Sequence, residues 1–298
     1  MKITINLMHR DRAFDPDAKK CVGYGHLNAD FELTHVVNAM ARMDGVIESV
    51  CRAALFTPLT TEDEIEFRRT VLLDARRNAP AIRRLYEILL HMDDVIRDKT
   101  YFTEVTAISL YRVNRFLVEL YIDYLEKLRV AAERDCAGYT SEPLRNLYSM
   151  LQTELSEEYI ESLRDCLATL PEHSEIAVTA GLNADFDGIS YEIDKKVEGA
   201  NKIRWQMAQS YVLVESSDNV TEAIKAWDAR RNRVINDLAV VMKTASQYMG
   251  TFFAMIRREL AFYVGCLNLE EKLRELGAPI CFPTLCPQKS RGREYRGV

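Results

Sequence analysis

The sequence has little glycine and little proline, and it lacks long hydrophobic runs. Its 298 residues include 12 Gly and 8 Pro, which fall in a few clusters. Long stretches therefore contain nothing that would interrupt a helix, which favours an all-α fold. No apolar run approaches the roughly 18 residues of a membrane-spanning helix, and the N-terminus alternates isoleucine with charge, unlike a secretion signal. We therefore expect a cytoplasmic protein without a membrane partner.

Cysteines are few, and their spacing does not suit a metal site. The seven cysteines are odd in number and mostly isolated, which indicates a reducing compartment rather than a disulfide framework. No pair has CxxC spacing, and no histidine lies close to Cys281 and Cys286, which are the nearest pair. Zinc sites normally need such spacings. We expect no bound metal.

Catalytic motifs are also absent. The sequence has no GxxxxGK[ST] loop for nucleotide phosphates, no GxSxG turn, no HExxH motif and no EF-hand loop. None of the five histidines has another histidine or a cysteine within four residues. We predict that the chain is not an enzyme, has no catalytic residues and no cofactor of its own, and neither binds ATP tightly nor hydrolyses it.

Positive charge does not dominate the sequence. It has 39 Lys and Arg against 45 Asp and Glu, a formal net charge of -6. Proteins that wrap nucleic acid over their whole surface are usually rich in Lys and Arg, so any anion site must be local. The composition, 48% hydrophobic and 28% charged, is that of a soluble globular protein.

Helical periodicity fills most of the chain after an N-terminal arm of residues 1–26. Apolar residues at three- and four-residue steps predict a helical core over residues 27–173. Its expected helices are Leu27–Leu55, Thr61–Asn78, Pro80–Met92, Phe102–Glu133 and Pro143–Leu170, the last with a break near Ser156. Pro58 ends the first helix, and Thr61 and Glu64 have the spacing of a capping box at the start of the second.

The pattern changes after residue 173. Residues 174–216 contain the runs IAVTAG, ISYEI and YVLVE between Gly, Asn and Asp residues, which predicts a small strand-bearing insert. Residues 217–283 form the predicted lever region. Within it, helical spacing runs from Val220 to Leu276, until Gly277 and Pro279 stop it, and predicts one helix about 85 Å long at 1.5 Å per residue. Residues 284–298 are typical of a linker. The predicted fold class is mainly α: a multi-helix core with long lever-like helices and a small strand-bearing insert.

Three arginine pairs recur at seven- to eight-residue steps. They are Arg68-Arg69, Arg76-Arg77 and Arg83-Arg84. Such a ridge can contact phosphate, or it can be a solvated face that pairs with Glu62, Glu64, Glu66 and Asp74. The nearby acids favour the second interpretation.

Two other basic groups are candidates for DNA contact. Lys195, Lys196, Lys202 and Arg204 lie in the predicted insert beside Trp205, and positive charge next to an aromatic ring suits a nucleic-acid backbone. Arg230, Arg231 and Arg233 follow early in the lever helix. Exposed loops and solvated helix faces also carry such residues routinely, so both interpretations stay open.

Two stretches resemble the MutS mismatch-repair family. CRAALFTPLTTEDEIEFRRTVLLDARRN (Cys51–Asn78), preceded by LNADFELTHVVNAMARMDG, is similar to the start of the MutS core domain, with its Pro-Leu turn and an Ile-x-x-Arg pattern, here Ile65 and Arg68. RRELAFYVGCLNLEEKLRELGAPICFP (Arg257–Pro283) resembles the end of the lever helix, where the family's core meets its ATPase. The chain thus resembles a bacterial subgroup of MutS-like proteins.

The resemblance implies a non-catalytic core and lever module. It implies DNA as a partner through the insert, a reduced clamp-like tip, and self-association of the full-length protein. ATP and Mg are expected only in a C-terminal domain beyond this chain. The family's Phe-x-Glu mismatch wedge has no counterpart, because Phe102-Thr103-Glu104 begins a predicted helix. The structure recognised is therefore either a DNA mismatch or another DNA structure.

The alternative hypothesis is a helical protein-interaction scaffold that does not bind DNA. Helical core positions do not distinguish it from a DNA-coupled lever. Salt-dependent DNA binding by the isolated chain would, because phosphate contacts release counterions.

Overall fold

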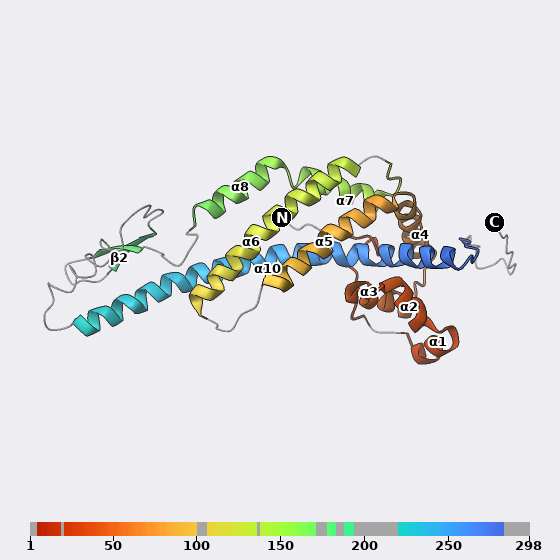
Figure 1. Ribbon diagram of the computed structural model, residues 1–298, viewed down its shortest axis with the longest axis horizontal. Helices are drawn as coiled ribbons and strands as arrows, with labels where there is room; N and C mark the ends of the chain where they lie inside the picture. Colours follow the sequence, from red (N-terminus) through yellow and green to blue (C-terminus); the bar gives the residue numbers. More distant parts are fainter. Residues whose placement is uncertain are drawn as a thin grey trace. The chain divides into compact units, whose positions relative to one another are not determined.

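The computed structural model describes residues 5–18, 21–99, 106–135, 138–170, 178–182, 188–193 and 220–282, with side chains in all of these except 178–182, 188–193 and 220–234. Most of the described residues are helical, which confirms the predicted mainly α class. The helices are α1 (Tyr24–Phe31), α2 (Leu33–Ala41), α3 (Gly45–Phe56), α4 (Glu62–Arg77), α5 (Ala79–Lys99), α6 (Ala107–Asp135), α7 (Glu142–Thr153), α8 (Glu157–Ala168) and α10 (Val220–Glu275) (Figure 1).

The chain divides into two compact units. Unit 1 comprises Met1–Asp94, Tyr124–Ser156 and Thr251–Val298, and unit 2 comprises Val95–Asp123 and Glu157–Gly250. The helices α5, α6 and α10 therefore contribute residues to both units. The domain boundaries predicted from composition at residues 26, 173, 216 and 283 stay predictions.

The single helix predicted over Leu27–Leu55 is wrong: the structure has three short helices there. Glu32 and Arg42 adopt left-handed backbone angles (φ 50° and 46°), and Met43 follows with φ 73°. Each left-handed residue stops the helical hydrogen bonding, so α1, α2 and α3 change direction at these points. Asp44 then starts α3, because its carboxylate accepts hydrogen bonds from the N–H groups of Val46 (2.8 Å) and Ile47 (3.1 Å).

Other helix boundaries agree with the sequence. Thr61 caps α4, since its hydroxyl oxygen accepts a hydrogen bond from the Glu64 N–H at 3.3 Å. Pro143 lies in the first turn of α7. α7 ends at Thr153 and α8 begins at Glu157, which confirms the predicted break near Ser156.

The predicted long helix is also confirmed. α10 runs without interruption over 56 residues, from Val220 to Glu275 (cyan to blue in Figure 1). It ends at Glu275, and Gly277, whose φ of 68° suits glycine, follows just after the end. The N–H groups of Gly277 and Ala278 donate to the carbonyls of Arg274 and Leu273, both at 2.9 Å, and these two bonds form a Schellman cap.

A two-stranded antiparallel sheet lies within residues 174–216. β1 (Val178–Leu182) pairs with β2 (Gly188–Ile193), with Val178 opposite Ile193 and an irregularity after Gly181. The other residues of 174–216 lie outside the described ones. The small strand-bearing insert predicted for residues 174–216 as a whole therefore stays a prediction.

Unit 1 is built around the C-terminal part of α10. Ile256, Leu260, Ala261, Tyr263 and Val264 of this segment are buried against the other helices of the unit. α3 approaches it closely at Gly265, where an added Cβ would lie 2.6 Å from the Cys51 Sγ and 3.0 Å from the Ile47 Cγ2. Burial raises the pKa of the neighbouring Cys266 thiol to about 12. This thiol therefore stays protonated at neutral pH, as expected of a structural cysteine.

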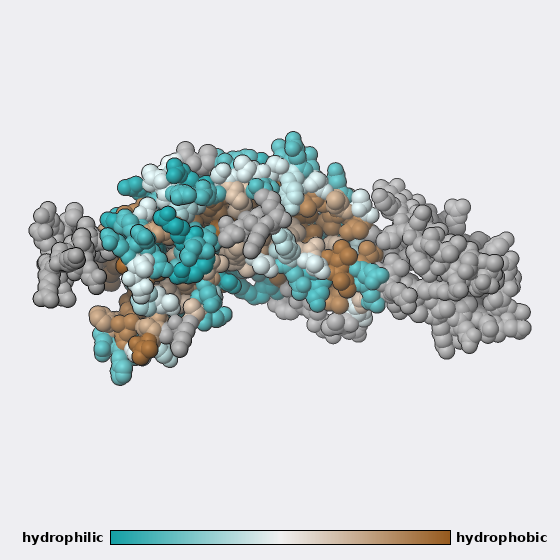
Figure 2. All heavy atoms as spheres, turned by 180° about the vertical axis from the view of Figure 1, so that it is seen from behind, coloured by the Kyte–Doolittle hydropathy of each residue, from teal (hydrophilic) through white to brown (hydrophobic). Residues whose placement is uncertain are grey.

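Hydrophobic side chains remain exposed around α1. This helix buries none of its own residues, and Val22, Tyr24 and Phe31 are exposed. Figure 2 shows hydrophobic side chains gathered at the surface of the α1–α3 part of unit 1 (brown, lower left).

Unit 2 pairs the N-terminal half of α6 with the middle of α10. The Ser246 hydroxyl donates a buried hydrogen bond of 2.6 Å to the Asn114 Oδ1. Gly250 allows Tyr121 to come close, since an added Cβ would lie 2.9 Å from the Tyr121 hydroxyl. α6 is thus the helix that packs along the middle of α10 in this unit. Among the described helices, none is both long and apolar enough to cross a membrane.

We expect Gly265→Ala to destabilise unit 1 by about 1–2 kcal/mol, because the overpacking cost at Cys51 exceeds the gain in helix propensity. Gly45→Ala is the matched control, since nothing lies within 4 Å of an added Cβ there. Urea unfolding monitored by circular dichroism measures both. Adding Cys51→Ala should recover part of the stability, and equal stability of the two glycine variants would show that the contact is not tight.

Candidate functional site

The structure leaves the predicted DNA-contact residues untested. Lys195, Lys196, Lys202 and Arg204 lie outside the described residues. Arg230, Arg231 and Arg233 lie on α10, but only their backbone is described. The candidate interface at these residues therefore stays a prediction.

The arginine pairs form neither a phosphate ridge nor the solvated face expected from the sequence. Only Arg69 pairs with one of the expected acids, Glu66, at 2.9 Å. Arg68 is buried and donates to the Met8 carbonyl at 3.2 and 3.3 Å. Arg84 donates two hydrogen bonds to Asp135, at 2.9 and 3.1 Å. These arginines are occupied inside the fold, whereas Arg77 is exposed.

Asp74, another expected partner of the arginines, has a different role. Its buried carboxylate accepts hydrogen bonds from the backbone N–H groups of Thr140 (3.0 Å) and Ser141 (2.8 Å) and from the Ser141 hydroxyl (2.7 Å). These bonds attach the start of α7 to the end of α4. Closeness in the sequence therefore does not predict which acid an arginine pairs with in the fold.

Three arginines from separate elements hold the end of α10. We call this set the arginine clasp: Arg42, Arg76 and Arg83 with Asn268, Glu270 and Glu271. Arg42 follows α2 and lies 2.8 Å from Glu271. Arg76, on α4, lies 2.6 Å from Glu270. Arg83, on α5, lies 2.7 Å from the Asn268 Oδ1 and 2.9 Å from Glu271. The clasp connects α2, α4 and α5 to the last turns of α10.

Asn268 is the buried centre of the clasp. Its side chain is 4% exposed, and its Nδ2 donates to the Met40 carbonyl at 2.8 Å while its Oδ1 accepts from Arg83. The surrounding ion pairs are partly exposed, with Arg76 at 37% and Glu271 at 47%. Solvent screening therefore keeps each pair weak, and the clasp acts through the number of elements it connects.

A second polar cluster ties the N-terminal segment to α10. Glu259 is 1% exposed and accepts hydrogen bonds from the backbone N–H groups of Leu7 (2.8 Å), Met8 (3.0 Å) and Phe14 (2.9 Å). The Tyr263 hydroxyl donates to the Leu7 carbonyl. Burial raises the pKa of the Glu259 carboxyl, although the three amide hydrogen bonds oppose this shift. The cluster positions residues 5–14 along α10 and gives no sign of catalytic chemistry.

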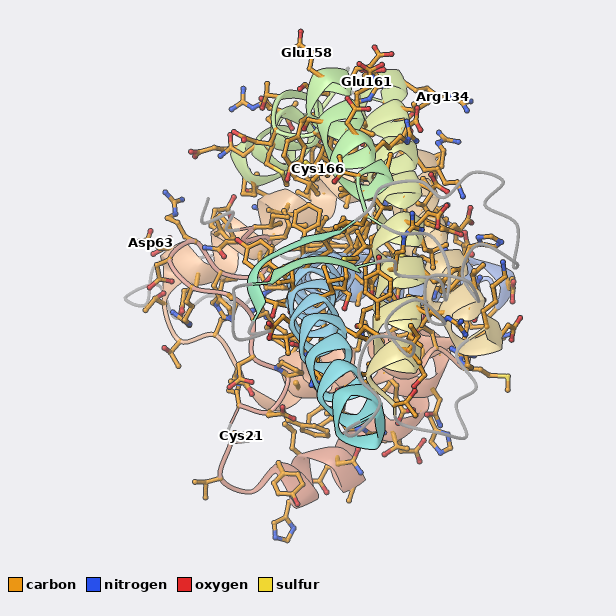
Figure 3. All side chains as sticks on the ribbon, turned by 90° about the vertical axis from the view of Figure 1, so that its left-hand side faces the viewer. Cys21, Asp63, Arg134, Glu158, Glu161 and Cys166 are labelled. Carbon is orange, nitrogen blue, oxygen red and sulfur yellow. The ribbon has the colours of Figure 1, made fainter. Side chains whose placement is uncertain are left out.

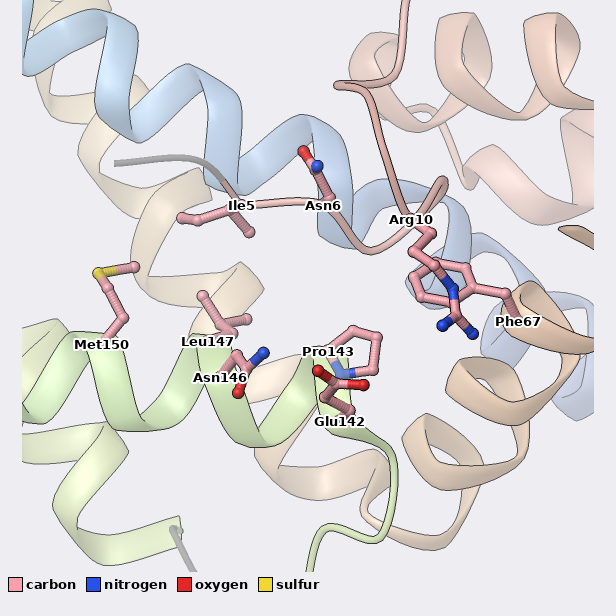
Figure 4. A pocket seen from close by; sticks show the side chains of 9 residues that line it. All are labelled: Ile5, Asn6, Arg10, Phe67, Glu142, Pro143, Asn146, Leu147 and Met150. Carbon is pink, nitrogen blue, oxygen red and sulfur yellow. The ribbon is translucent and has the colours of Figure 1, made fainter. Parts of the chain in front are cut away.

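A hollow of about 300 Å³ lies beside this segment (Figure 4). Arg10 stands over the Phe67 ring at 5.5 Å on one side, and Glu142 and Asn146 of α7 line another. Its lining combines one cation, one anion and two amides with apolar side chains, and no nucleophile lies beside a base in it. In the described part of the chain, no three His, Cys, Asp or Glu residues could hold a metal ion.

An acidic stripe covers the exposed side of α8 in unit 2. Glu158, Glu161 and Asp165 recur at helical spacing, and all three are exposed. Figure 3 shows Glu158 and Glu161 pointing away from the ribbon. A surface with this charge repels phosphate, so this side of α8 is unsuited to nucleic acid.

The sequence interpretation singled out Arg76 and Arg83 but missed Arg42 and the rest of the clasp. Glu270 and Glu271 form an adjacent acidic pair near the end of the long helix, which is the signal that was available. Glu259 gave no signal, because a single Glu in a helix is ordinary.

We expect the double variant Arg76→Ala/Arg83→Ala to lower the free energy of unfolding by about 2 kcal/mol, since it removes the ion pairs of α4 and α5 with the end of α10 and a hydrogen-bond donor from the buried Asn268. The control is the double variant Arg52→Ala/Arg69→Ala. Each of these arginines forms an ion pair with a glutamate of its own helix, so neither connects two elements. This control should lower it by less than about 1 kcal/mol. If urea unfolding gives the same loss of free energy of unfolding for both double variants, the clasp does not stabilise the fold more than ordinary ion pairs do.

We expect Glu259→Gln to destabilise the chain by about 2–3 kcal/mol, because the new amide N–H would face a backbone N–H donor. Hydrogen exchange should then be faster at the amides of Leu7, Met8 and Phe14. Glu275→Gln, on the exposed end of the same helix, is the control and should leave these amides protected. Unchanged protection in Glu259→Gln would show that other interactions hold the segment.

Comparison with known proteins gives one match. A family model described as the MutS2 N-terminal domain matches residues 60–276, which is most of the chain. No curated protein and no solved structure matches the chain.

Proposed function

This chain belongs to the MutS2 N-terminal domain family, and we propose that it is the non-catalytic core and lever module of a MutS-like DNA-binding ATPase. In this proposal α10 is the lever, residues 174–216 supply the DNA contact, and an ATP- and Mg-binding domain follows the chain. The full-length protein would act in the cytoplasm as a dimer on mismatched DNA or another DNA structure.

The arginine clasp is the observation that carries this proposal. A lever transmits movement only if its end is fixed to the body that has to move. α10 is one uninterrupted helix of 56 residues, and its last turns are held by arginines from three separate elements of unit 1. A displacement at the end of α10 would therefore be shared by α2, α4 and α5, because packed helices move as rigid bodies.

The distribution of charge supports DNA contact through the insert rather than through the core. Five of the six paired arginines are engaged within unit 1, and the exposed side of α8 is acidic. The grouped basic residues Lys195, Lys196, Lys202 and Arg204 are our first candidates for DNA contact, followed by Arg230, Arg231 and Arg233 on α10.

We expect the chain to bind duplex DNA at low salt, and the quadruple alanine variant of Lys195, Lys196, Lys202 and Arg204 to bind more weakly across all DNA sequences. The slope of log K against log salt should fall by about 0.9 for each phosphate group that the variant no longer binds. Fluorescence anisotropy titrations at several salt concentrations measure both quantities.

A matched control removes four positive charges elsewhere. Arg112, Arg134, Arg145 and Lys243 are exposed, and replacing them with Ala changes the net charge equally. If this control weakens DNA binding as much as the insert variant does, the loss of net charge explains the effect, and the proposed DNA contact through the insert is wrong. If the wild-type chain shows no binding even at low salt, the protein-interaction scaffold becomes the better hypothesis.

A further inference from the structure

The chain leaves α10 through a short segment that lies against unit 1. We call residues 277–282 the exit strap. Gly277 turns the chain in a left-handed conformation, and Pro279 fixes one backbone angle within the strap. Partly buried residues then alternate with exposed ones: Ala278, Ile280 and Phe282 with Pro279 and Cys281. Such alternation is typical of an extended segment with one side against the protein and the other towards solvent.

The last residue of the strap contacts the arginine clasp. The Phe282 ring lies over the Arg76 guanidinium, with 5.0 Å between the ring centroid and Cζ, which is within the range of a cation–π contact. The Arg76 Nε also donates to the Glu270 Oε1 at 2.6 Å. A planar guanidinium can stack on a ring and donate from its edge at the same time. Arg76 is therefore the residue at which α4, the end of α10 and the exit strap meet (Figure 1).

The Phe282 ring stabilises the ion pair that it covers. The Arg76 side chain is 37% exposed, so water weakens its attraction to Glu270. A ring over one face of the guanidinium removes part of this water and adds an attraction between the cation and the ring. Without the ring, Arg76 would be more hydrated, and its bond to Glu270 would open more often.

Opening of the Arg76 bond leaves Glu270 with a second partner. The Glu270 side chain is only 12% exposed, and its Oε1 also lies 2.5 Å from Arg274, one turn further along α10. A buried carboxylate that lost its only cation would be strongly destabilised, whereas Glu270 keeps Arg274. Arg42 and Arg83 meanwhile keep their own partners on α10. The clasp can therefore open at Arg76 alone without stranding a charge.

We propose that the exit strap is a release latch for the clasp. While Phe282 covers Arg76, α4 holds the end of α10; when the strap is displaced, Arg76 releases Glu270. The clasp then has two states, and the position of the strap selects between them. A movement of the chain beyond the strap would thus reach α4 first. This last step rests on the proposed function, in which a nucleotide-binding domain follows, whereas the latch itself lies within unit 1.

Exchange of the Arg76 Nε–H with water, followed by nuclear magnetic resonance, measures the latch. Loss of the signal in Arg76→Lys assigns it. We expect Phe282→Ala to speed this exchange by about three- to five-fold, the factor that corresponds to a partly exposed cation–π contact. Phe282→Tyr keeps an aromatic ring and should leave the exchange as slow as in the wild-type chain.

Three controls separate release of Arg76 from general loosening. Cys281→Ala shortens an exposed side chain of the same strap and should leave the exchange unchanged. The Arg84 Nε–H, which donates to Asp135 at 2.9 Å outside the clasp, should exchange at one rate in all variants. In a Glu270→Ala background, Phe282→Ala should have no further effect, because the bond that the ring protects is already lost.

Three results would overturn the proposal. They are unchanged exchange at Arg76 in Phe282→Ala, equal acceleration at Arg76 and Arg84, and the same acceleration in Cys281→Ala. These measurements use the chain without DNA or nucleotide, so they are independent of the DNA titrations that test the proposed function. A chain that fails to bind DNA can still show the latch, and a chain that binds DNA can lack it.

Discussion

The burial of α10 on nearly all sides within unit 1 is the constraint on which the rest of this unit depends. From Ile256 to Asn268 most positions are buried, including the polar residues Arg257, Glu259 and Asn268. A buried charge or amide without partners costs several kcal/mol, so each of these residues must be matched by another element. Arg257 bonds to Asp44 and Asp93, Glu259 to three backbone amides, and Asn268 to Met40 and Arg83. The surrounding elements are thus positioned by the polar side chains of one helix.

The long regular helices could be predicted from the sequence, whereas the helix breaks made by residues with left-handed backbone angles could not. The 56 residues of α10 keep one period, and its glycine stop is visible in the sequence, so both ends could be placed. The breaks between α1, α2 and α3 are made by Glu32, Arg42 and Met43 in left-handed conformations. Because such residues seldom adopt a positive φ, periodicity alone continued the helix through them.

Two of the three cations of the candidate site, Arg76 and Arg83, were singled out from the sequence, whereas Arg42 and the partners of all three were not. Arg76 and Glu270 lie 194 positions apart, and no local pattern connects them. The sequence interpretation paired the arginines with nearby acids. In the structure Asp74 instead holds the start of α7, and Arg76 and Arg83 bind residues of α10. Five of the six paired arginines are used in contacts within the fold, so arginine pairs in the sequence are a weak indicator of nucleic-acid contact here.

Asp44 shows how these partnerships affect the way the chain opens. One carboxylate oxygen caps α3, and the other accepts hydrogen bonds from Tyr86 and Arg257 at 3.0 Å each. If α3 frayed at its start, Arg257 would lose a counter-charge while still buried, so a partial opening would cost more than the cap alone. The start of α3 and the middle of the α10 segment should therefore open together, as one cooperative unit. Fluctuations that expose one of these segments without the other are suppressed by a single side chain.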